Sequence, residues 1–139
     1  MTGLLVLVAV LVAATAFGLF RAARDGRMKR GRAGSAVRLT GRDLGEPLGE
    51  QATLVQFSTS FCAACPGTRR LLGKVAGERP GVRLVEIDAE ARLDLVRRLD
   101  VLRTPTVLVL DGQGHVTHHS VGAPSRAEVL AALEPATAA

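Results

Sequence analysis

Residues 52–78, "ATLVQFSTSFCAACPGTRRLLGKVAGE", place a pair of cysteines between a strand pattern and a helix pattern. The run 52–58 is mostly apolar and has the length of a buried strand. In 67–78, Leu71, Leu72 and Val75 share one helical face, which predicts an amphipathic helix. Cys62 and Cys65 lie at the junction of these elements and are the only 2 cysteines of the chain. The fold and the chemistry therefore both depend on this junction.

A C-x-x-C pair allows three interpretations: a structural disulfide, half of a metal site, or a dithiol that exchanges electrons. A disulfide across three positions closes a very small loop and removes little entropy from the unfolded chain, which argues against a purely structural bond. At the start of a helix, free backbone N–H groups and the positive end of the helix dipole lower the pKa of a thiol. We therefore expect a reactive thiolate at Cys62 and a shielded second thiol at Cys65.

The chain from residue 36 onward alternates strand and helix patterns. Strands are predicted over 36–40, 82–88, 106–111 and 115–121, and helices over 90–100 and 125–134. Ser125 and Glu128 form a capping-box pattern at the start of the last helix. Together with the strand and helix described above, this order combines a βαβ crossover with a closing hairpin. It predicts an α/β fold in which a mixed central sheet is flanked by helices.

Residues 36–134 resemble a thioredoxin domain along their whole length. "TLVQFSTSFCAAC" is similar to the central strand and active-site region of that family, and "VEIDAE" to its next strand. "DVLRTPTVLVLDGQGHV" is similar to the cis-proline segment and the hairpin after it, and "VGAPS" to the entry to the last helix. By this resemblance Pro105 is the cis-proline, Thr104 lines the substrate groove, and Gly122 is a glycine at a close backbone approach.

The resemblance implies a thiol–disulfide oxidoreductase, and the cytoplasmic exposure that we expect for the domain favours the direction of a protein-disulfide reductase. Cys62 attacks a substrate disulfide, and Cys65 resolves the mixed disulfide. The redox-active disulfide Cys62–Cys65 is then the only redox group, without a further cofactor, and the partners are protein disulfides and an electron donor. Where the family usually has Trp-Cys-Gly-Pro-Cys, this chain has an apolar Phe61 at the rim and two alanines between the cysteines.

Gln56 is a further departure from the family pattern. Six residues before the first cysteine, thioredoxins bury an aspartate that handles the proton of the second cysteine. The lysine that faces this aspartate in the family aligns with Leu84. Losing both charges together is physically consistent, since a lysine left alone in a core is costly. Two interpretations stay open: Gln56 changes how Cys65 loses its proton, or it only satisfies local hydrogen bonds.

The segment Leu4–Phe20 is apolar and free of charge, and as a helix it would rise about 26 Å, close to the hydrocarbon thickness of a bilayer. A signal peptide is the alternative, with "ATA" (Ala14–Ala16) as a small-residue cleavage pattern. Positive charge follows the apolar run instead of preceding it, which favours an uncleaved single-pass anchor. We divide the chain into an anchor (1–20), a basic juxtamembrane linker (21–35) and a thioredoxin-like domain (36–139).

The positive charge of the chain is concentrated next to the anchor. Residues 21–42 carry eight basic residues and one acidic residue, whereas the formal net charge of the whole chain is +5. The remaining chain is therefore mildly acidic, and the basic flank is suited to anionic lipid. By the positive-inside rule, we expect this flank and the domain after it on the cytoplasmic side of the cell membrane. With 4 Phe and neither Trp nor Tyr, the chain does not fit a nucleic-acid-binding protein.

Three alternatives accompany the reductase hypothesis. A metal site could join the two cysteines to two of the histidines His115, His118 and His119. The hairpin 106–121 that carries these histidines is expected away from the cysteines, so we expect no metal. An extracytoplasmic thioredoxin-like reductase for cytochrome maturation or exported thiols would share the fold and differ in topology. A non-catalytic thioredoxin-fold adaptor would have no need of either sulfur.

Overall fold

The computed structural model describes residues 1–30 and 37–138. Residues 31–36 and 139 lie outside the described residues. Three expectations fall partly there: the last five residues of the linker 21–35, the basic residue Arg32, and Ala36, which opens the strand expected over 36–40.

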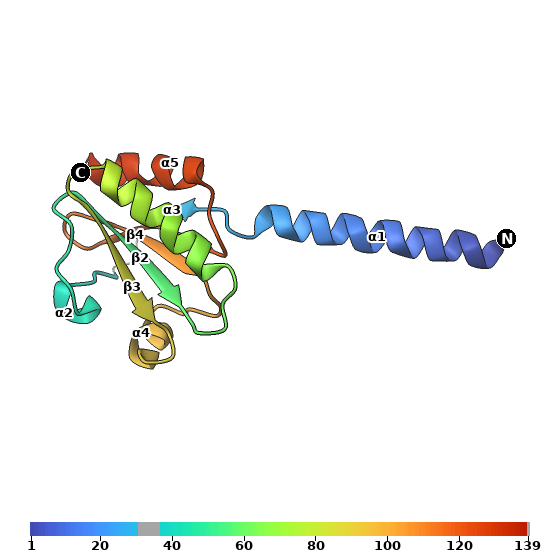
Figure 1. Ribbon diagram of the computed structural model, residues 1–139, viewed down its shortest axis with the longest axis horizontal. Coiled ribbons are helices and arrows are strands. Elements are labelled where there is room, and N and C mark those ends of the chain that lie inside the picture. The colour runs from blue at the N-terminus through green and yellow to red at the C-terminus, as the bar shows by residue number, and fades with distance from the viewer. Residues whose placement is uncertain (31–36, 139) are drawn as a thin grey trace.

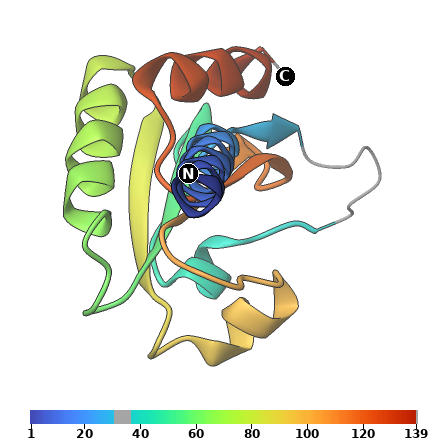
Figure 2. The ribbon, with the colours of Figure 1, turned by 90° about the vertical axis from the view of Figure 1, so that its right-hand side faces the viewer.

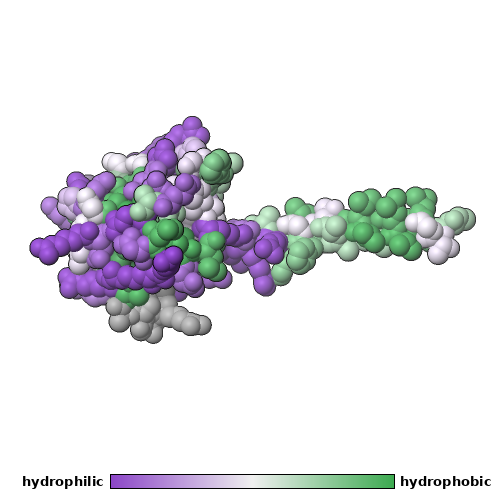
Figure 3. Space-filling view, turned by 90° about the horizontal axis from the view of Figure 1, so that it is seen from below, coloured by the Kyte–Doolittle hydropathy of each residue, from purple (hydrophilic) through white to green (hydrophobic). Residues whose placement is uncertain are grey.

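Helix α1 (Thr2–Arg24) projects away from the rest of the protein (Figure 1). None of its 23 residues is buried. The helix is long and apolar enough to cross a membrane, a test that a signal sequence near the N-terminus also passes. It continues four residues past Phe20, so the start of the segment expected as a linker is helical. Hydrophilic side chains gather where α1 meets the folded part of the chain (Figure 3).

The centre of the folded part is a mixed sheet of five strands. They are β1 (Lys29–Arg30), β2 (Ala52–Ser58), β3 (Val82–Asp88), β4 (Thr106–Asp111) and β5 (Val116–Val121). Their order is β1-β5-β4-β2-β3, with β2 and β3 parallel and the other neighbours antiparallel. The predicted strands 52–58, 82–88 and 106–111 have the observed bounds, and β5 begins one residue later than expected.

Helices cover both faces of this sheet (Figure 2). Helices α3 (Cys65–Glu78) and α5 (Arg126–Thr137) pack on one face, over a core that includes Leu54, Leu72 and Leu133. The short helices α2 (Gly41–Leu44) and α4 (Leu93–Arg98) pack on the other, over a core that includes Phe57 and Leu95. The prediction of a mixed α/β sheet between helices is confirmed.

The prediction of a strand over 36–40 is wrong for the described residues 37–40. There, Arg38 forms only an isolated bridge with His115. Most of the edge beside β5 is taken by β1, where Lys29 pairs with His119 and Arg30 with His118. The local pattern could not show this, because two basic residues have no apolar period and pair only with a strand far along the chain. Charged side chains are typical of an exposed sheet edge.

Two helices also differ from their predictions. Helix α2 was not expected, although Thr40 and Asp43 form the capping box at its start. The helix expected over 90–100 extends only from 93 to 98. Its beginning is replaced by a turn, since the backbone oxygen of Asp88 accepts hydrogen bonds from the N–H groups of Ala91 and Arg92 at 3.2 and 3.0 Å.

Candidate active site

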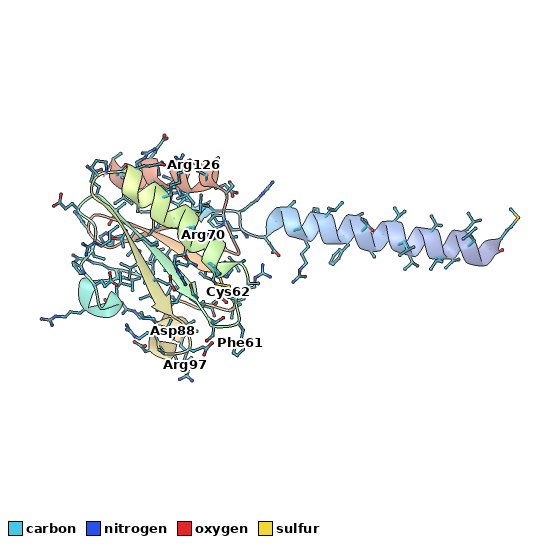
Figure 4. All side chains as sticks on the ribbon, viewed as in Figure 1. Phe61, Cys62, Arg70, Asp88, Arg97 and Arg126 are labelled. Atoms are coloured by element: carbon cyan, nitrogen blue, oxygen red, sulfur yellow. A yellow bond between two sulfur atoms is a disulfide. The ribbon has the colours of Figure 1, made fainter. Side chains whose placement is uncertain are left out.

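The cysteine loop lies between β2 and α3, at the end of the sheet nearest to α1 (Figure 4). Cys62 and Cys65 form a disulfide. Helix α3 begins at Cys65, with Pro66 in its first turn. The sequence predicted Cys62 at the start of this helix. In the structure, Cys62 instead precedes the first helical residue by three positions. Its N–H donates to the oxygen of Thr59, and its own oxygen accepts from the N–H of Cys65, both at 3.3 Å.

The two sulfur-bearing residues differ in exposure. Cys65 retains 2% of its accessible surface, whereas Cys62 is partly exposed. Phe61, directly before it, is 93% exposed. The turn is held from outside by Glu90, whose Oε1 accepts hydrogen bonds from the N–H and the hydroxyl of Ser60 at 3.3 Å. A partner protein can therefore reach Cys62, whereas Cys65 is accessible mainly to Cys62 itself.

The segment before β4 forms the second side of the site. The peptide bond between Thr104 and Pro105 is cis, as the resemblance implied. The hydroxyl oxygens of Thr104 and Thr59 lie 3.3 Å apart, which joins this segment to the cysteine loop. Sequence reasoning missed Thr59, because a threonine in a loop carries no signal of a partner that lies 45 positions away.

The third segment at the site contains Gly122. Its N–H donates to the backbone oxygen of Pro105 at 2.8 Å. The φ of Gly122 is +96°, and a Cβ at this position would lie 2.9 Å from the backbone nitrogen of Gly26. The expected close approach therefore exists, but it is made to the chain that leaves α1. The roles of Phe61, Thr104, Pro105 and Gly122 toward a substrate stay predictions.

Gln56 lies on β2 directly beneath the buried cysteine. It is fully buried, and its Nε2 donates to the backbone oxygen of Cys65 at 3.0 Å. Among the described residues, its Oε1 has no hydrogen-bond partner. Leu84 packs against the core on this face of the sheet. The position thus combines contact with the resolving cysteine and the absence of a facing lysine, so an ionised side chain here would be strongly desolvated.

Replacing Gln56 with aspartate tests which role this residue has. Burial without a cation should raise the pKa of the new carboxyl above its unfolded value of ~3.9. The folded state then holds the proton more tightly than the unfolded state. The free energy of unfolding is therefore highest below the unfolded pKa, and it falls by up to ~1.4 kcal/mol per pH unit as the pH rises from the unfolded to the folded pKa. If Gln56 limits proton loss from Cys65, the same change should speed mixed-disulfide resolution near pH 7.

The matched control is Gln56→Asn, which has the size of aspartate without the charge. Chemical unfolding followed by circular dichroism at pH 5 and pH 8 gives the stabilities, and acid-quenched single-turnover reactions give the resolution rates. Equal resolution rates for the Asp and Asn variants would show that Gln56 is only a hydrogen-bonding residue of the core.

His118 and His119 lie on β5, and His115 lies directly before it; the structure does not bring these histidines to the cysteines. Burial lowers the pKa of His118, with a smaller contribution from Arg30 and His119. Burial likewise lowers the pKa of His119, assisted by Lys29. Within residues 1–30 and 37–138, the structure shows no group of three or more His, Cys, Asp or Glu side chains that could hold a metal ion. The arrangement therefore gives no support to a metal site that combines these cysteines and histidines.

Several solved structures with a similar fold are thioredoxins. A mutant thioredoxin from Halobacterium salinarum has 18% identity and a TM-score of 0.57, over 63% of this chain and 76% of that one. Thioredoxin-2 of the malaria parasite has 17% identity and a TM-score of 0.56, over 61% and 82%. Oxidised mitochondrial thioredoxin 3 from Saccharomyces cerevisiae has 20% identity and a TM-score of 0.54, over 62% and 79%. At these identities the likeness establishes the fold alone.

Comparison with family models gives the stronger result. No curated protein matches the chain at a significant level. The family model for thioredoxin, by contrast, matches residues 39–135, well over half of the chain. This range contains the cysteine loop, the cis-proline segment and Gly122. Members of this family use a redox-active disulfide as their redox group, and the Cys62–Cys65 pair occupies that place here. The chain therefore belongs to the thioredoxin family.

Proposed function

We propose that this protein is a membrane-anchored protein-disulfide reductase. The observation that carries the proposal is the unequal pair of cysteines, with Cys62 partly exposed and Cys65 buried, in one site with a cis-proline segment. A structural disulfide would not need one accessible sulfur beside an exposed aromatic rim. Membership of the thioredoxin family supports disulfide exchange in general, and the features of this chain support the more specific role.

The reaction begins with the reduced protein. The Cys62 thiolate attacks one sulfur of a substrate disulfide, the substrate S–S bond breaks, and the departing substrate sulfur takes up a proton. Cys65 then loses its proton to water or to the departing substrate, and its thiolate attacks Cys62. The second substrate thiol leaves, and the disulfide Cys62–Cys65 forms. Two electrons have passed to the substrate. A donor protein with a dithiol then supplies two further electrons, which reduce the Cys62–Cys65 disulfide for the next cycle.

Substrate contacts follow from the residues around Cys62. Thr104 and Pro105 hold the backbone of the substrate beside the attacking sulfur, and Gly122 supports Pro105 from behind. Phe61 forms an apolar rim. Gln56 holds the backbone of Cys65 and offers no carboxylate as a proton acceptor, which is why water or the substrate takes the proton.

Membrane anchoring is supported by α1. None of the residues of this apolar helix is buried in the protein, so its side chains would be exposed to water. The hydrocarbon of a bilayer removes Leu4–Phe20 from water. The basic flank contacts anionic headgroups on the cytoplasmic side. The cytoplasm keeps dithiols reduced, so this side favours the reductive direction.

A single-turnover reaction tests the proposed chemistry. The full chain in nanodiscs is reduced, freed of reductant and mixed with an excess of insulin. We expect about one insulin disulfide to be reduced per protein, with conversion of both thiols to the Cys62–Cys65 disulfide, because one dithiol carries two electrons. Mass spectrometry after alkylation measures both. A protein whose two thiols are free but which reduces no disulfide would contradict the proposal.

A further inference from the structure

We propose that the active site faces the membrane surface, and that the substrate is a disulfide in the juxtamembrane segment of an integral membrane protein. This inference rests on the proposed function, since it requires both the membrane anchor and disulfide exchange. It adds a substrate class, which follows from the way α1 is joined to the catalytic domain.

The junction between α1 and the domain is held in place by specific contacts. The N–H of Gly26 donates to the backbone oxygen of Val121 at 2.7 Å, and the hydroxyl of Ser120 donates to the oxygen of Gly26 at 2.7 Å. Gly26 has a φ of +83°, and a Cβ there would lie 2.2 Å from the oxygen of Ala123. Only glycine fits this contact. Strand β1 then pairs with β5, so the chain leaving α1 is part of the domain and not a free tether.

The same junction lies directly behind the cis-proline segment. Gly122 donates to Pro105, and it approaches Gly26 closely, so one glycine contacts both the active site and the end of the helix. Asp25, immediately after α1, forms an ion pair with Arg103 at 2.6 Å. Arg103 precedes Thr104. The end of α1 is therefore connected to the substrate groove by two sets of contacts, one through Gly122 and the other through Arg103. Figure 2, which looks along α1, shows the segments leading into β4 and α5 passing beside it.

The position of the bilayer follows from the end of the apolar run. With Leu4–Phe20 in the hydrocarbon, Arg21 and Arg24 lie in the headgroup layer, which is about 5–8 Å thick on each side. Asp25 and Gly26 then lie at the membrane surface. Phe61 and Cys62 lie on the side of the domain from which α1 leaves (Figure 4). The reactive cysteine therefore lies on the side of the domain that faces the headgroups.

This placement favours one kind of substrate. A large soluble protein would have to enter between the domain and the lipid surface, whereas a segment that leaves a neighbouring transmembrane helix already lies there. Confinement to the same thin layer raises the effective concentration of such a segment. Apolar side chains are exposed in both segments of the site: Phe61 in the cysteine loop at 93%, and Leu102, two residues before Thr104, at 84%. Such side chains suit the apolar residues that flank a membrane span.

The orientation can be measured without any catalysis. In the full chain with Cys65→Ser, a fluorophore is attached to Cys62. In the control, Cys62→Ser and Cys65→Ser are combined with Gln113→Cys, and the fluorophore is attached in the exposed turn between β4 and β5. Strand β4 has 6 residues, so this turn lies about 20 Å farther along the sheet. With quenchers on lipid headgroups, we expect several-fold stronger quenching at Cys62. Equal quenching, or stronger quenching at the turn, would overturn the inference.

Substrate preference is tested in vesicles that contain the reduced protein and a model transmembrane peptide. One peptide carries a disulfide next to its apolar segment, and the other carries it on a Gly/Ser extension of about thirty residues, which spans roughly 30 Å. We expect the surface disulfide to react about tenfold faster. A Gly/Ser linker of about twelve residues inserted between Arg24 and Asp25 leaves the junction contacts in place, frees the domain from α1 and should remove this preference.

A small soluble disulfide serves as the reference in the same vesicles. Its rate should be the same with and without the inserted linker. If this reference is reduced but the surface disulfide has no advantage, or if its advantage survives the linker, the inference is wrong and the proposed function stands. If neither peptide nor the soluble reference is reduced, the proposed function itself is wrong.

Discussion

Replacing Cys65 with serine should leave substrate proteins covalently attached to Cys62. In this variant Cys62 still attacks a disulfide, but no second thiol is present to release the partner. Adducts that disappear on treatment with dithiothreitol should therefore accumulate in cells. Cys62→Ser should form none and should lose disulfide reduction completely, because Cys65 is buried and cannot reach a substrate. Non-reducing gels followed by mass spectrometry of the trapped partners measure both outcomes.

The two cysteines should also differ in reactivity before any substrate is present. In the reduced protein, Cys62 should react with alkylating agents well below the ~8.5 pKa of an ordinary thiol, whereas Cys65 should react poorly. A metal site would instead make both serine variants lose bound metal alike, and a non-catalytic adaptor would keep full cellular function in both. The absence of reducible adducts on Cys65→Ser would contradict the exchange mechanism.

A reporter enzyme that is active only outside the cytoplasm, fused after Ala139, should be silent, and a reporter active only in the cytoplasm should give full signal. The basic residues after the apolar segment determine this orientation, since Arg and Lys next to a membrane span are retained on the cytoplasmic side. Arg21, Arg24 and Arg27 lie within the described residues, directly at the end of α1 and beyond it.

A charge-reversal variant provides the matched control for topology. Lysines at positions 2 and 3 (Thr2→Lys, Gly3→Lys) are combined with glutamine at all six basic residues that follow the span: Arg21, Arg24, Arg27, Lys29, Arg30 and Arg32. The positive charge next to the span then lies at its other end. The two reporter signals should then exchange. Strong external activity of the unmodified fusion, or a mature N-terminus near Phe17, would show that the anchor on the cytoplasmic side is the wrong assignment.

Much of the site was accessible from sequence because its parts are local. The strand 52–58, the cysteine pair and the amphipathic helix follow one another within 27 residues. Each can be recognised from the spacing of residues only a few positions apart. The resemblance to thioredoxins then located the cis bond at Pro105, which the structure contains. The position of Gln56 relative to Cys65 was also inferred in this way, although its hydrogen bond to the backbone of Cys65 was not.

Contacts between segments far apart in the chain were decided only by the tertiary structure. Of the described residues 37–40, expected as part of a strand, only Arg38 bridges to the hairpin, at His115, whereas β1 pairs with β5. Neither segment has a period that predicts which of them pairs with β5. The contacts of the cysteine loop are another case, because the hydroxyl of Thr59 lies beside that of Thr104, and Ser60 donates to Glu90, 45 and 30 positions along the chain. Such hydrogen bonds form only after the sheet has brought the loops together.

The sequence by itself determined that this protein carries a thioredoxin-type dithiol and an apolar segment long enough to span a membrane. Only the tertiary structure decided how the two are related. Asp25 and Gly26 are an acidic residue and a glycine in a basic stretch, and nothing nearby indicates their partners. Their contacts with Arg103 and Val121 join residues separated by more than half of the chain. Burial of Gly26 against Ala123 leaves no room for a side chain, and this fit places the end of α1 beside Gly122, which donates to Pro105 of the cis-proline segment.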